Sequence, residues 1–220
     1  MNLECIEITP PAEPVATVIV LHGLGADGTD FLPLADEIDL AAVGPVRWVL
    51  PRAPVRPVTI NGGYPMRAWY DILAPDLQRR EDEAGLRQSF AEVHELIERE
   101  IARGVPARRI VLAGFSQGAA ITLGAGLRCR RRLAGLAALS GYLPLASSSA
   151  AERSEENAGL TVFGAHGARD GVVVPERGRA ARDALEALGH PVQWHEYPME
   201  HSVCAEEVRD LGAWLRGALA

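Results

Sequence analysis

The chain contains no lysine, because all 22 of the basic residues among its 220 are arginine. This absence excludes a Ser–Lys dyad, a Schiff base on a lysine amine and a phosphate-binding loop built around a lysine. The formal net charge is −7. It argues against general binding of nucleic acid or anionic membranes, because such binding relies on clustered positive charge. We therefore expect no nucleic-acid partner.

Cysteine is also scarce, and Cys5, Cys129 and Cys204 form no CxxC pair. Three separate cysteines predict neither a disulfide framework nor a zinc site, and we expect no bound metal. The first residues lack the basic start and apolar run of a signal peptide, and no apolar run approaches the roughly 20 residues that span a bilayer. These absences predict a cytoplasmic protein without stable membrane insertion.

What is present is a regular alternation of strand-like and helix-like segments. Short apolar runs predict buried strands, with a further edge strand at 3–8; the runs are 16–21, 46–50, 109–113, 133–139, 160–163 and 192–197. Apolar residues spaced by three and four predict helices across 86–101 and 208–219, and 175–188 opens with proline and stops before Gly189. The alternation predicts an α/β fold with a mainly parallel sheet and helices on both faces. No repeat or composition break divides the chain, so we expect one domain spanning residues 1–220.

Two segments do not fit this alternation. Residues 51–81 are rich in proline and contain Tyr64, Met66, Trp69 and Tyr70, and a connection of this length within one domain is usually functional or flexible. Residues 146–159 are small and polar, which predicts a mobile surface loop.

The pentapeptide GFSQG at 114–118 matches the G-x-S-x-G motif of a nucleophile elbow. Such an elbow presents the serine hydroxyl above the sheet edge, and its two glycines remove side chains that would collide at the sharp turn. The motif alone would also fit a tight turn with an incidental serine. The strand predicted before it and the small-residue helix predicted after it favour the elbow, with Ser116 as the nucleophile.

A serine hydroxyl needs a histidine to accept its proton and a carboxylate to orient that histidine. After an elbow, the acid and then the histidine follow along the chain, each on a loop after a strand. Asp170 and His201 occupy such positions, so they are the candidate acid and base. The other candidates lie inside predicted strands or helices, at a helix end, before the acid, or directly beside the histidine: His195, Glu196, His94, His190, His166 and Glu200.

The HGLG loop at 22–25 follows the predicted strand 16–21 and can aim a backbone N–H at a carbonyl oxygen as it becomes an alkoxide. The second such donor is expected to be the N–H of Gln117, the residue after the nucleophile. Glycines also cradle phosphates, but this loop does not match G-x-G-x-x-G, and no clear acidic residue ends a strand about 20 residues further on. We do not expect nucleotide binding.

Six sequence blocks follow one another along the chain: LHGLGADGTDF (21–31), RAWYDI (67–72), GFSQGAAI (114–121), LSGYLP (139–144), GARDGVVVP (167–175) and PMEHSV (198–203). Together, in this order, they resemble the bacterial carboxylesterase and acyl-protein thioesterase family. This family is also described as the phospholipase/carboxylesterase family and has the α/β-hydrolase fold. The resemblance covers nearly the whole chain.

This resemblance implies a triad of Ser116, Asp170 and His201, and oxyanion donors at Leu24 and Gln117. It also implies that no cofactor is needed, that the chain pairs as a homodimer, and that substrates are small esters, lysophospholipids or S-acyl groups. The loop that carries Trp69 is then expected to line the acyl site. The substrate-binding candidates are Leu24, Met66, Trp69 and Ile72.

Other functions are compatible with the same motifs. A ligand-binding protein of this fold that has lost its chemistry is one alternative, although all three triad positions are filled. A peptidase or acyltransferase with the same triad is another, although the chain is too short for an evident peptide-selecting domain. A shallow site would favour acetyl to butyryl esters, whereas a long groove beneath 51–81 would admit long thioesters. The apolar residues of that segment predict a preference for short to medium chains. The arginine-rich stretch 128–132 is interpreted as a solvated helix end rather than a polyanion site.

Overall fold

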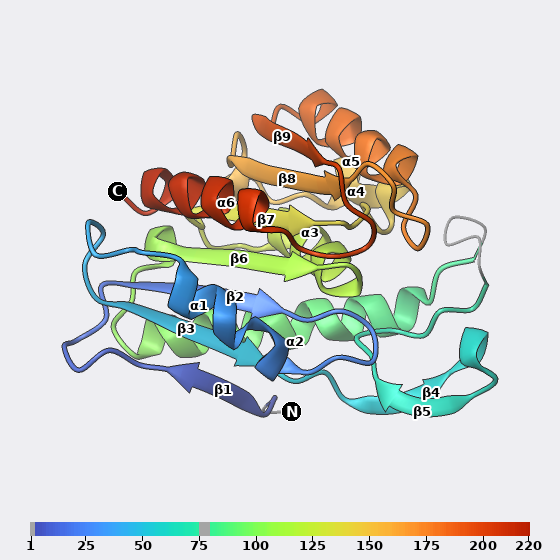
Figure 1. Cartoon of the computed structure of the whole chain (residues 1–220), viewed down its shortest axis with the longest axis horizontal. Helices are drawn as coiled ribbons and strands as arrows, with labels where there is room; N and C mark the ends of the chain where they lie inside the picture. The colour runs from blue at the N-terminus through green and yellow to red at the C-terminus, as the bar shows by residue number, and fades with distance from the viewer. Residues whose placement is uncertain (1–2, 75–79) are drawn as a thin grey trace.

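The computed structural model describes residues 3–74 and 80–220, and these residues are organised around a seven-stranded sheet (Figure 1). Its strands are β1 (Cys5–Ile8), β2 (Ala16–Leu21), β3 (Val46–Pro51), β6 (Ile110–Phe115), β7 (Gly135–Leu139), β8 (Val162–Gly167) and β9 (Val192–Tyr197). They lie in the order β1-β3-β2-β6-β7-β8-β9, and every neighbouring pair is parallel except β1 and β3. β1 is the predicted edge strand.

The central strands are buried on both faces because nearly all of their residues are apolar or small. In β2 all six residues are buried, and successive side chains alternate between the faces. Ile19 and Leu21 belong to the core on one side of the sheet, and Val18 and Val20 to the core on the other. Parallel pairing brings the carboxyl ends of β2, β6, β8 and β9 to one edge, so the loops that follow these strands meet there.

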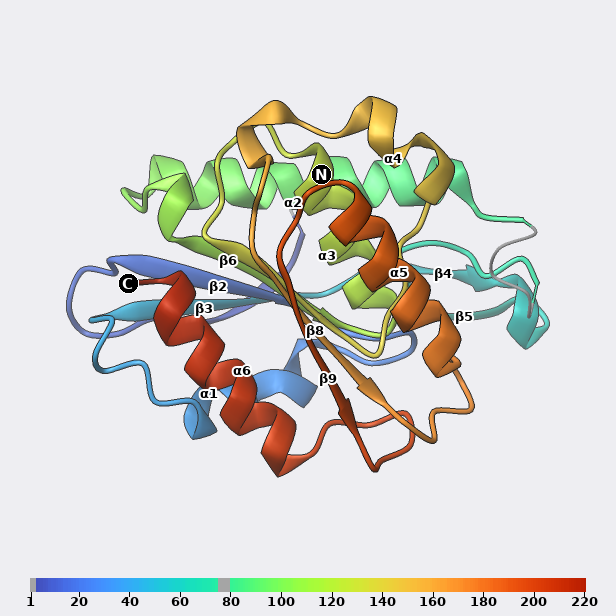
Figure 2. The ribbon, with the colours of Figure 1, turned by 90° about the horizontal axis from the view of Figure 1, so that it is seen from above.

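Helices cover both faces of the sheet, which confirms the predicted fold (Figure 2). One face carries α1 (Leu32–Glu37) and α6 (Ala205–Ala218), and the other carries α2 (Glu83–Ala102), α3 (Gln117–Arg128) and α5 (Pro175–Ala187). The small residues of α3 permit close packing, since a Cβ on Gly126 would lie 2.3 Å from the Leu136 side chain. Within residues 3–74 and 80–220, no helix combines the length and the apolarity that crossing a membrane requires.

The proline-rich segment 51–81 is more regular than predicted where the structure describes it. It forms an antiparallel hairpin of β4 (Val55–Val58) and β5 (Tyr64–Arg67), which is separate from the main sheet. The carboxylate of Asp71 fastens the hairpin by accepting hydrogen bonds from the Thr59 N–H at 2.7 Å and the Thr59 hydroxyl at 2.5 Å. Residues 75–79 of the segment lie outside the described part of the chain.

The prediction of a loop at 146–159 is wrong, because this stretch forms α4 (Ala146–Glu152) and a short 3-10 turn. Long-range partners anchor it to the neighbouring helices. Glu152 forms ion pairs with Arg87 at 2.8 Å and with Arg128 at 2.7 Å. Asn157 is buried, and its side-chain amide donates to the carbonyls of Cys129 at 2.7 Å and Arg131 at 3.0 Å. The small, polar residues of this stretch therefore form a helix that their composition did not predict.

Candidate active site

Ser116 occupies the sharp turn between β6 and α3, with φ 56° and ψ −117°. This left-handed conformation is unusual for a residue with a side chain, and the tight surroundings enforce it. A Cβ on Gly114 would lie 2.4 Å from the carbonyl oxygen of Gly118, and one on Gly118 would lie 2.1 Å from the carbonyl oxygen of Leu21. Both motif glycines are therefore required by close backbone contacts, as predicted for an elbow.

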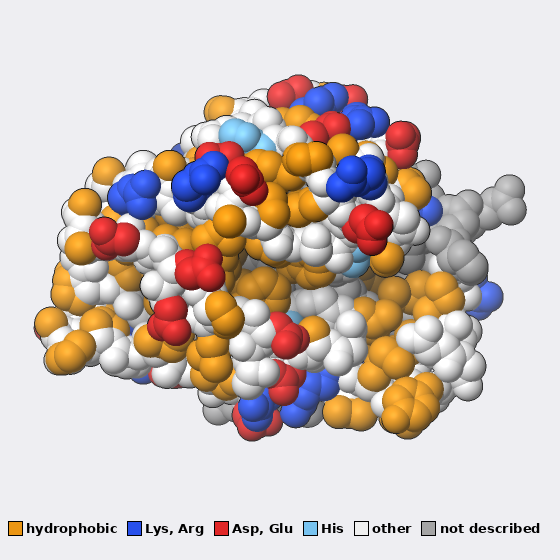
Figure 3. Space-filling model, viewed as in Figure 1, with side chains coloured by type: hydrophobic (Ala, Val, Ile, Leu, Met, Phe, Trp, Pro, Cys, Tyr) orange, Lys and Arg blue, Asp and Glu red, His pale blue; other side chains and the backbone are white. Residues whose placement is uncertain are grey.

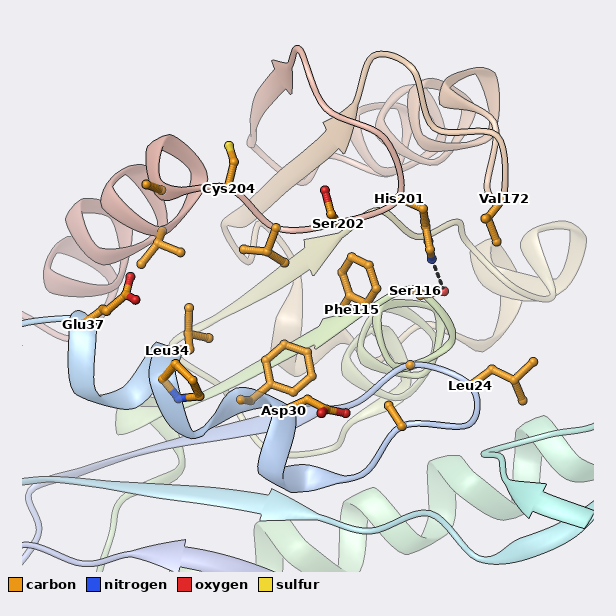
Figure 4. A pocket seen from close by; sticks show the side chains of 17 residues that line it. Leu24, Asp30, Leu34, Glu37, Phe115, Ser116, Val172, His201, Ser202 and Cys204 are labelled. Atoms are coloured by element: carbon orange, nitrogen blue, oxygen red, sulfur yellow. Dashed lines mark hydrogen bonds between the residues drawn. The ribbon is translucent and has the colours of Figure 1, made fainter.

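The structure brings Ser116, His201 and Asp170 into one hydrogen-bonded chain. The Ser116 hydroxyl lies 2.9 Å from Nε2 of His201 (Figure 4). Nδ1 of His201 lies 2.6 Å from Oδ2 of Asp170. A carboxylate only accepts hydrogen bonds, so Nδ1 carries the proton and Nε2 is free to accept from the serine. The ring of Phe115 packs beside the imidazole, with 4.7 Å between the ring centroids, and restricts its tilt.

Asp170 is held rigidly behind the histidine. Its side chain is fully buried, and Oδ1 accepts hydrogen bonds from the backbone N–H groups of Val172 at 2.8 Å and Val173 at 2.9 Å. These bonds close a tight turn in the loop after β8. They occupy one carboxylate oxygen, so that the other is directed at His201.

Leu24 lines the cleft beside Ser116, and Gln117 follows Ser116 as the first residue of α3. Among the described residues, the N–H groups of Leu24 and Gln117 donate to none of the backbone carbonyls that turns, loops and helix caps use. For Gln117 this is expected, since the first N–H groups of a helix have no partner within it, and the helix N-terminus also favours negative charge. The sequence predicted both groups as oxyanion donors.

The loop that carries Leu24 is fixed by a buried histidine. Nε2 of His22 lies 3.0 Å from the N–H of Ala53 and must accept from it, so Nδ1 carries the proton and donates to the Gly23 carbonyl at 2.7 Å. Burial lowers the pKa of His22, which keeps this ring neutral. The indole N–H of Trp69 donates to the His22 carbonyl at 2.8 Å. The loop is thereby locked before any substrate arrives.

Trp69 supports the site from beneath and does not line the cleft, so its prediction as a substrate-binding residue needs correction. Its side chain is fully buried, and its backbone N–H donates to Oε1 of Gln117 at 2.8 Å. The amide of Gln117 donates in turn to the Tyr70 carbonyl at 2.8 Å. Met66 and Ile72 are half-buried and are also absent from the described lining of the cleft beside the serine.

A cleft of about 670 Å³ opens beside Ser116 and runs between α1 and the start of α6 (Figures 3 and 4). Its lining is mostly apolar and includes Leu24, Phe31, Leu34, Phe115, Val172, Val203, Cys204 and Val208. The carboxylates of Asp30 and Glu37 also line it. The sequence analysis expected the loop that carries Trp69 to line the acyl site, but of its four substrate-binding candidates only Leu24 belongs to the lining of this cleft.

Two of the other candidates of the sequence analysis have partners outside the triad, and a third contacts it. Glu196 forms an ion pair with Arg179 at 2.8 Å. His94, on α2, bonds to the Ala125 carbonyl of α3 at 2.9 Å. His166 is the third, since its Nε2 lies 3.5 Å from Oδ2 of Asp170. No group of three or more His, Cys, Asp or Glu that could hold a metal occurs within the described ranges.

Several arginines of the stretch 128–132 are paired rather than free to bind polyanions. Besides the Arg128–Glu152 pair, Arg131 contacts Glu98 at 2.6 Å, and Arg132 donates to the carbonyl of Ala158 at 2.7 Å. The stretch therefore serves to connect α2, α3 and the segment after α4.

Comparisons with known proteins agree with this architecture. Residues 3–218 match the family model described as phospholipase/carboxylesterase. Acyl-protein thioesterase 1 of Mycosarcoma maydis is 43% identical over 230 residues, covering 97% of this chain and 96% of the relative. A probable carboxylesterase of Oryza sativa subsp. japonica is 34% identical over 205 residues, covering 92% of this chain and 77% of the relative.

The solved structure of Zea mays acyl-protein thioesterase 2 is similar over 100% of both chains, with a TM-score of 0.88 and 30% identity. These similarities confirm the family resemblance that the sequence blocks indicated. The relatives come from a fungus and from plants, so the narrower attribution to bacterial members does not follow from them.

Proposed function

Because the chain belongs to the phospholipase/carboxylesterase family of α/β-hydrolases, we propose that it is a serine hydrolase that cleaves carboxylic esters and thioesters through an acyl-enzyme on Ser116. The observation that carries the proposal is the continuous hydrogen-bonded chain from Ser116 through His201 to the buried Asp170. That chain supplies a nucleophile, a proton acceptor and a group that orients the acceptor.

The reaction proceeds in two halves. Nε2 of His201 takes the proton of the Ser116 hydroxyl as its oxygen attacks the carbonyl carbon, and Asp170 stabilises the imidazolium that forms. His201 then gives that proton to the departing alkoxide or thiolate, leaving the acyl group on Ser116. Water, deprotonated by the same nitrogen, attacks the acyl-enzyme and releases the carboxylic acid and the free serine.

Negative charge on the carbonyl oxygen is stabilised by the backbone N–H groups of Leu24 and Gln117. Both donors are fixed before the reaction begins. His22 and Trp69 hold the loop that carries Leu24, and Gln117 is held at the start of α3. Loss of one such donor typically costs on the order of 3 kcal/mol of transition-state stabilisation.

We assign the acyl chain of the substrate to the cleft between α1 and α6. It is continuous with Ser116 and falls in the range of about 300–1,000 Å³ that is typical of small-molecule sites. The Asp30 and Glu37 carboxylates in its lining disfavour extension of a long apolar chain, because burying a charge against hydrocarbon is costly. Short to medium acyl chains are therefore the preferred substrates.

The test is hydrolysis of p-nitrophenyl esters from acetyl to palmitoyl, with thioesters of the same acyl groups, by the wild type and Ser116→Ala. Turnover by the wild type alone, with an optimum below palmitoyl, is expected. Turnover by Ser116→Ala would show that the nucleophile is another residue, and a palmitoyl optimum would overturn the chain-length proposal. If no substrate is turned over, an active-site phosphonate decides, since a ligand-binding protein without chemistry would remain unlabelled.

The proposal includes a cytoplasmic location and pairing as a homodimer. The first is supported by Cys5, Cys129 and Cys204, which are all free thiols as expected in a reducing compartment. The second is an implication of the family and is checked by sedimentation velocity of the purified chain.

A further inference from the structure

A second histidine contacts the candidate catalytic acid. His166 lies on β8, four residues before Asp170, and its side chain is fully buried. Nε2 of His166 is 2.7 Å from the carbonyl oxygen of Val173 and 3.5 Å from Oδ2 of Asp170. The mechanism described above uses His201 alone, so the buried His166 ring requires its own explanation.

The hydrogen bond to Val173 determines the tautomer of His166. A carbonyl oxygen only accepts, so the proton resides on Nε2 and is directed at Val173, with Oδ2 of Asp170 as a second, more distant acceptor. Among the described residues, Nδ1 of His166 has no hydrogen-bond partner. A second proton on that nitrogen would be a buried donor without an acceptor, which is costly.

The surroundings of His166 are shaped to hold a flat ring. A Cβ on Gly178 of α5 would lie 2.4 Å from Nδ1 of His166, so only glycine leaves room on that side. The ring of Trp194 lies on β9, with centroids 6.1 Å apart and 30° between the planes. β8 therefore presents the N–H of His166 toward Val173 in a fixed direction.

Val173 is also one of the two residues that hold Asp170, because its N–H donates to Oδ1 at 2.9 Å. His166 thus secures the carbonyl of the same residue whose N–H secures the carboxylate. We propose that His166 is a positioning residue, which fixes the 170–173 turn on β8 and thereby aims Oδ2 of Asp170 at His201. This inference rests on the proposed function, in which Asp170 orients the base.

Three variants at position 166 separate the hydrogen bond from simple filling of space. His166→Gln keeps an N–H donor near the position of Nε2, whereas the shorter amide of His166→Asn does not reach Val173 and His166→Leu has no donor. We expect kcat to fall about 10- to 100-fold in the Asn and Leu variants, with KM unchanged, because small misplacements of catalytic groups are expensive. His166→Gln should recover most of the loss.

The matched control is His94→Leu, which removes another histidine bonded to a backbone carbonyl, on α2 and outside the triad. It should leave kcat unchanged. Equal kcat values for folded His166→Leu and wild type would overturn the proposal, and so would equal losses in the Gln and Asn variants. If His166→Leu does not fold, the Gln and Asn pair still decides, since both are polar amides that differ in reach.

A spectroscopic measurement separates this inference from the proposed function. The His201 Nδ1 proton, held in the 2.6 Å contact with Asp170, should give a downfield resonance in the wild type and in Ser116→Ala. That resonance should broaden or vanish in His166→Asn and persist in His166→Gln and His94→Leu. Its survival in His166→Asn would overturn the positioning role. Absence of turnover by the wild type would instead count against the hydrolase proposal alone.

Discussion

The backbone N–H of Trp69 donates a 2.8 Å hydrogen bond to the side chain of Gln117, the residue directly after the candidate nucleophile. Because the same amide also donates to the Tyr70 carbonyl, one side chain satisfies two backbone groups that lie 47 and 48 positions away in the chain. Gln117 thereby has two separate tasks. In the proposed mechanism its backbone N–H stabilises the carbonyl oxygen of the substrate, and its side chain holds the segment that packs beneath the oxyanion loop.

Replacing Gln117 by leucine should destabilise the protein while preserving the oxyanion donor. The buried N–H of Trp69 and carbonyl of Tyr70 would lose their partners, at a cost of about 1–3 kcal/mol for each group. Urea denaturation measures the change in the free energy of unfolding. Gln193→Leu is the control, since Gln193 is exposed on β9 and its amide contacts the His195 ring of the same strand at 2.8 Å; it should change the stability by less than about 0.5 kcal/mol. A stable Gln117→Leu variant would contradict the bracing role.

Gly118, the second glycine of the G-x-S-x-G motif, should tolerate no side chain. In Gly118→Ala the new Cβ would meet the backbone oxygens of Leu21 at 2.1 Å and His22 at 2.6 Å. Relief requires β2 and the oxyanion loop to move, so we expect a loss of about 3 kcal/mol or more and little remaining turnover. Thermal unfolding and ester hydrolysis measure the two effects.

Gly217→Ala is the matched control, because Gly217 lies in α6 and a Cβ there would meet nothing within 4 Å. Alanine is the better helix former, so this variant should gain up to about 1 kcal/mol. Wild-type stability and activity in Gly118→Ala would show that the elbow is less constrained than its contacts indicate.

The sequence was most informative where the structure depends on local pattern. The predicted strand 16–21 coincides with β2, because this short β-branched apolar run directly reflects burial in a sheet. The predicted strand 192–197 also coincides with β9, although most of its residues are exposed or only partly buried. The nucleophile turn could also be predicted from the sequence. A side chain on either of its glycines would collide with residues a few positions away in the chain or with the end of the neighbouring strand β2. Strand order along the chain then sufficed to bring Asp170 and His201 toward the serine.

Predictions failed where distant partners decide the outcome. An aromatic residue in a proline-rich segment suggested a substrate wall, but hydrogen bonds to Gln117 and His22 draw Trp69 into the core. The polar stretch 146–159 suggested a loop, but Arg87 and Arg128 from two other helices hold Glu152 in α4. The location of the cleft depends on how α1 lies against α6, which no local pattern encodes.

The buried carboxyl group of Glu207 should make stability decrease as the pH rises. Burial in the first turn of α6 raises its pKa to about 8, and the nearby backbone of Cys204 offsets this only in part. The folded state therefore retains a proton that the unfolded state releases above its ordinary pKa of 4.5. The stability that this proton supports is complete below that value, declines as the pH rises, and is lost by the time the pH has passed about 8.

Glu207→Gln removes the titration while keeping the shape of the side chain. The free energy of unfolding, measured by urea denaturation at several pH values across this window, should show a weaker decrease in the variant, by about 1–3 kcal/mol over the whole range. Glu206→Gln is the control, since Glu206 is exposed on the same turn, its pKa is lowered by hydrogen bonds to the helix start, and it cannot produce a loss at rising pH. Parallel curves for Glu207→Gln and wild type would refute the assignment.

The position of the acyl chain can be determined by placing a tryptophan in one of two sites at a time, the cleft between α1 and α6 or the 51–81 segment. Ala205 lines the cleft and is exposed at the start of α6, so Ala205→Trp should narrow the cleft without disturbing the core. Ile60→Trp places the same side chain at an exposed position of the 51–81 segment, which the sequence analysis expected to line the acyl site. Each methylene excluded from an apolar site costs about 0.8 kcal/mol. If Ala205→Trp removes the contacts of three or four methylenes in the cleft, its kcat/KM for hexanoyl and octanoyl esters should fall by about 50-fold or more. Acetyl ester hydrolysis should remain near the wild-type rate in both variants. If Ile60→Trp alone shifts the optimum toward shorter chains, the acyl chain runs beneath the hairpin, and the cleft between α1 and α6 serves another part of the substrate.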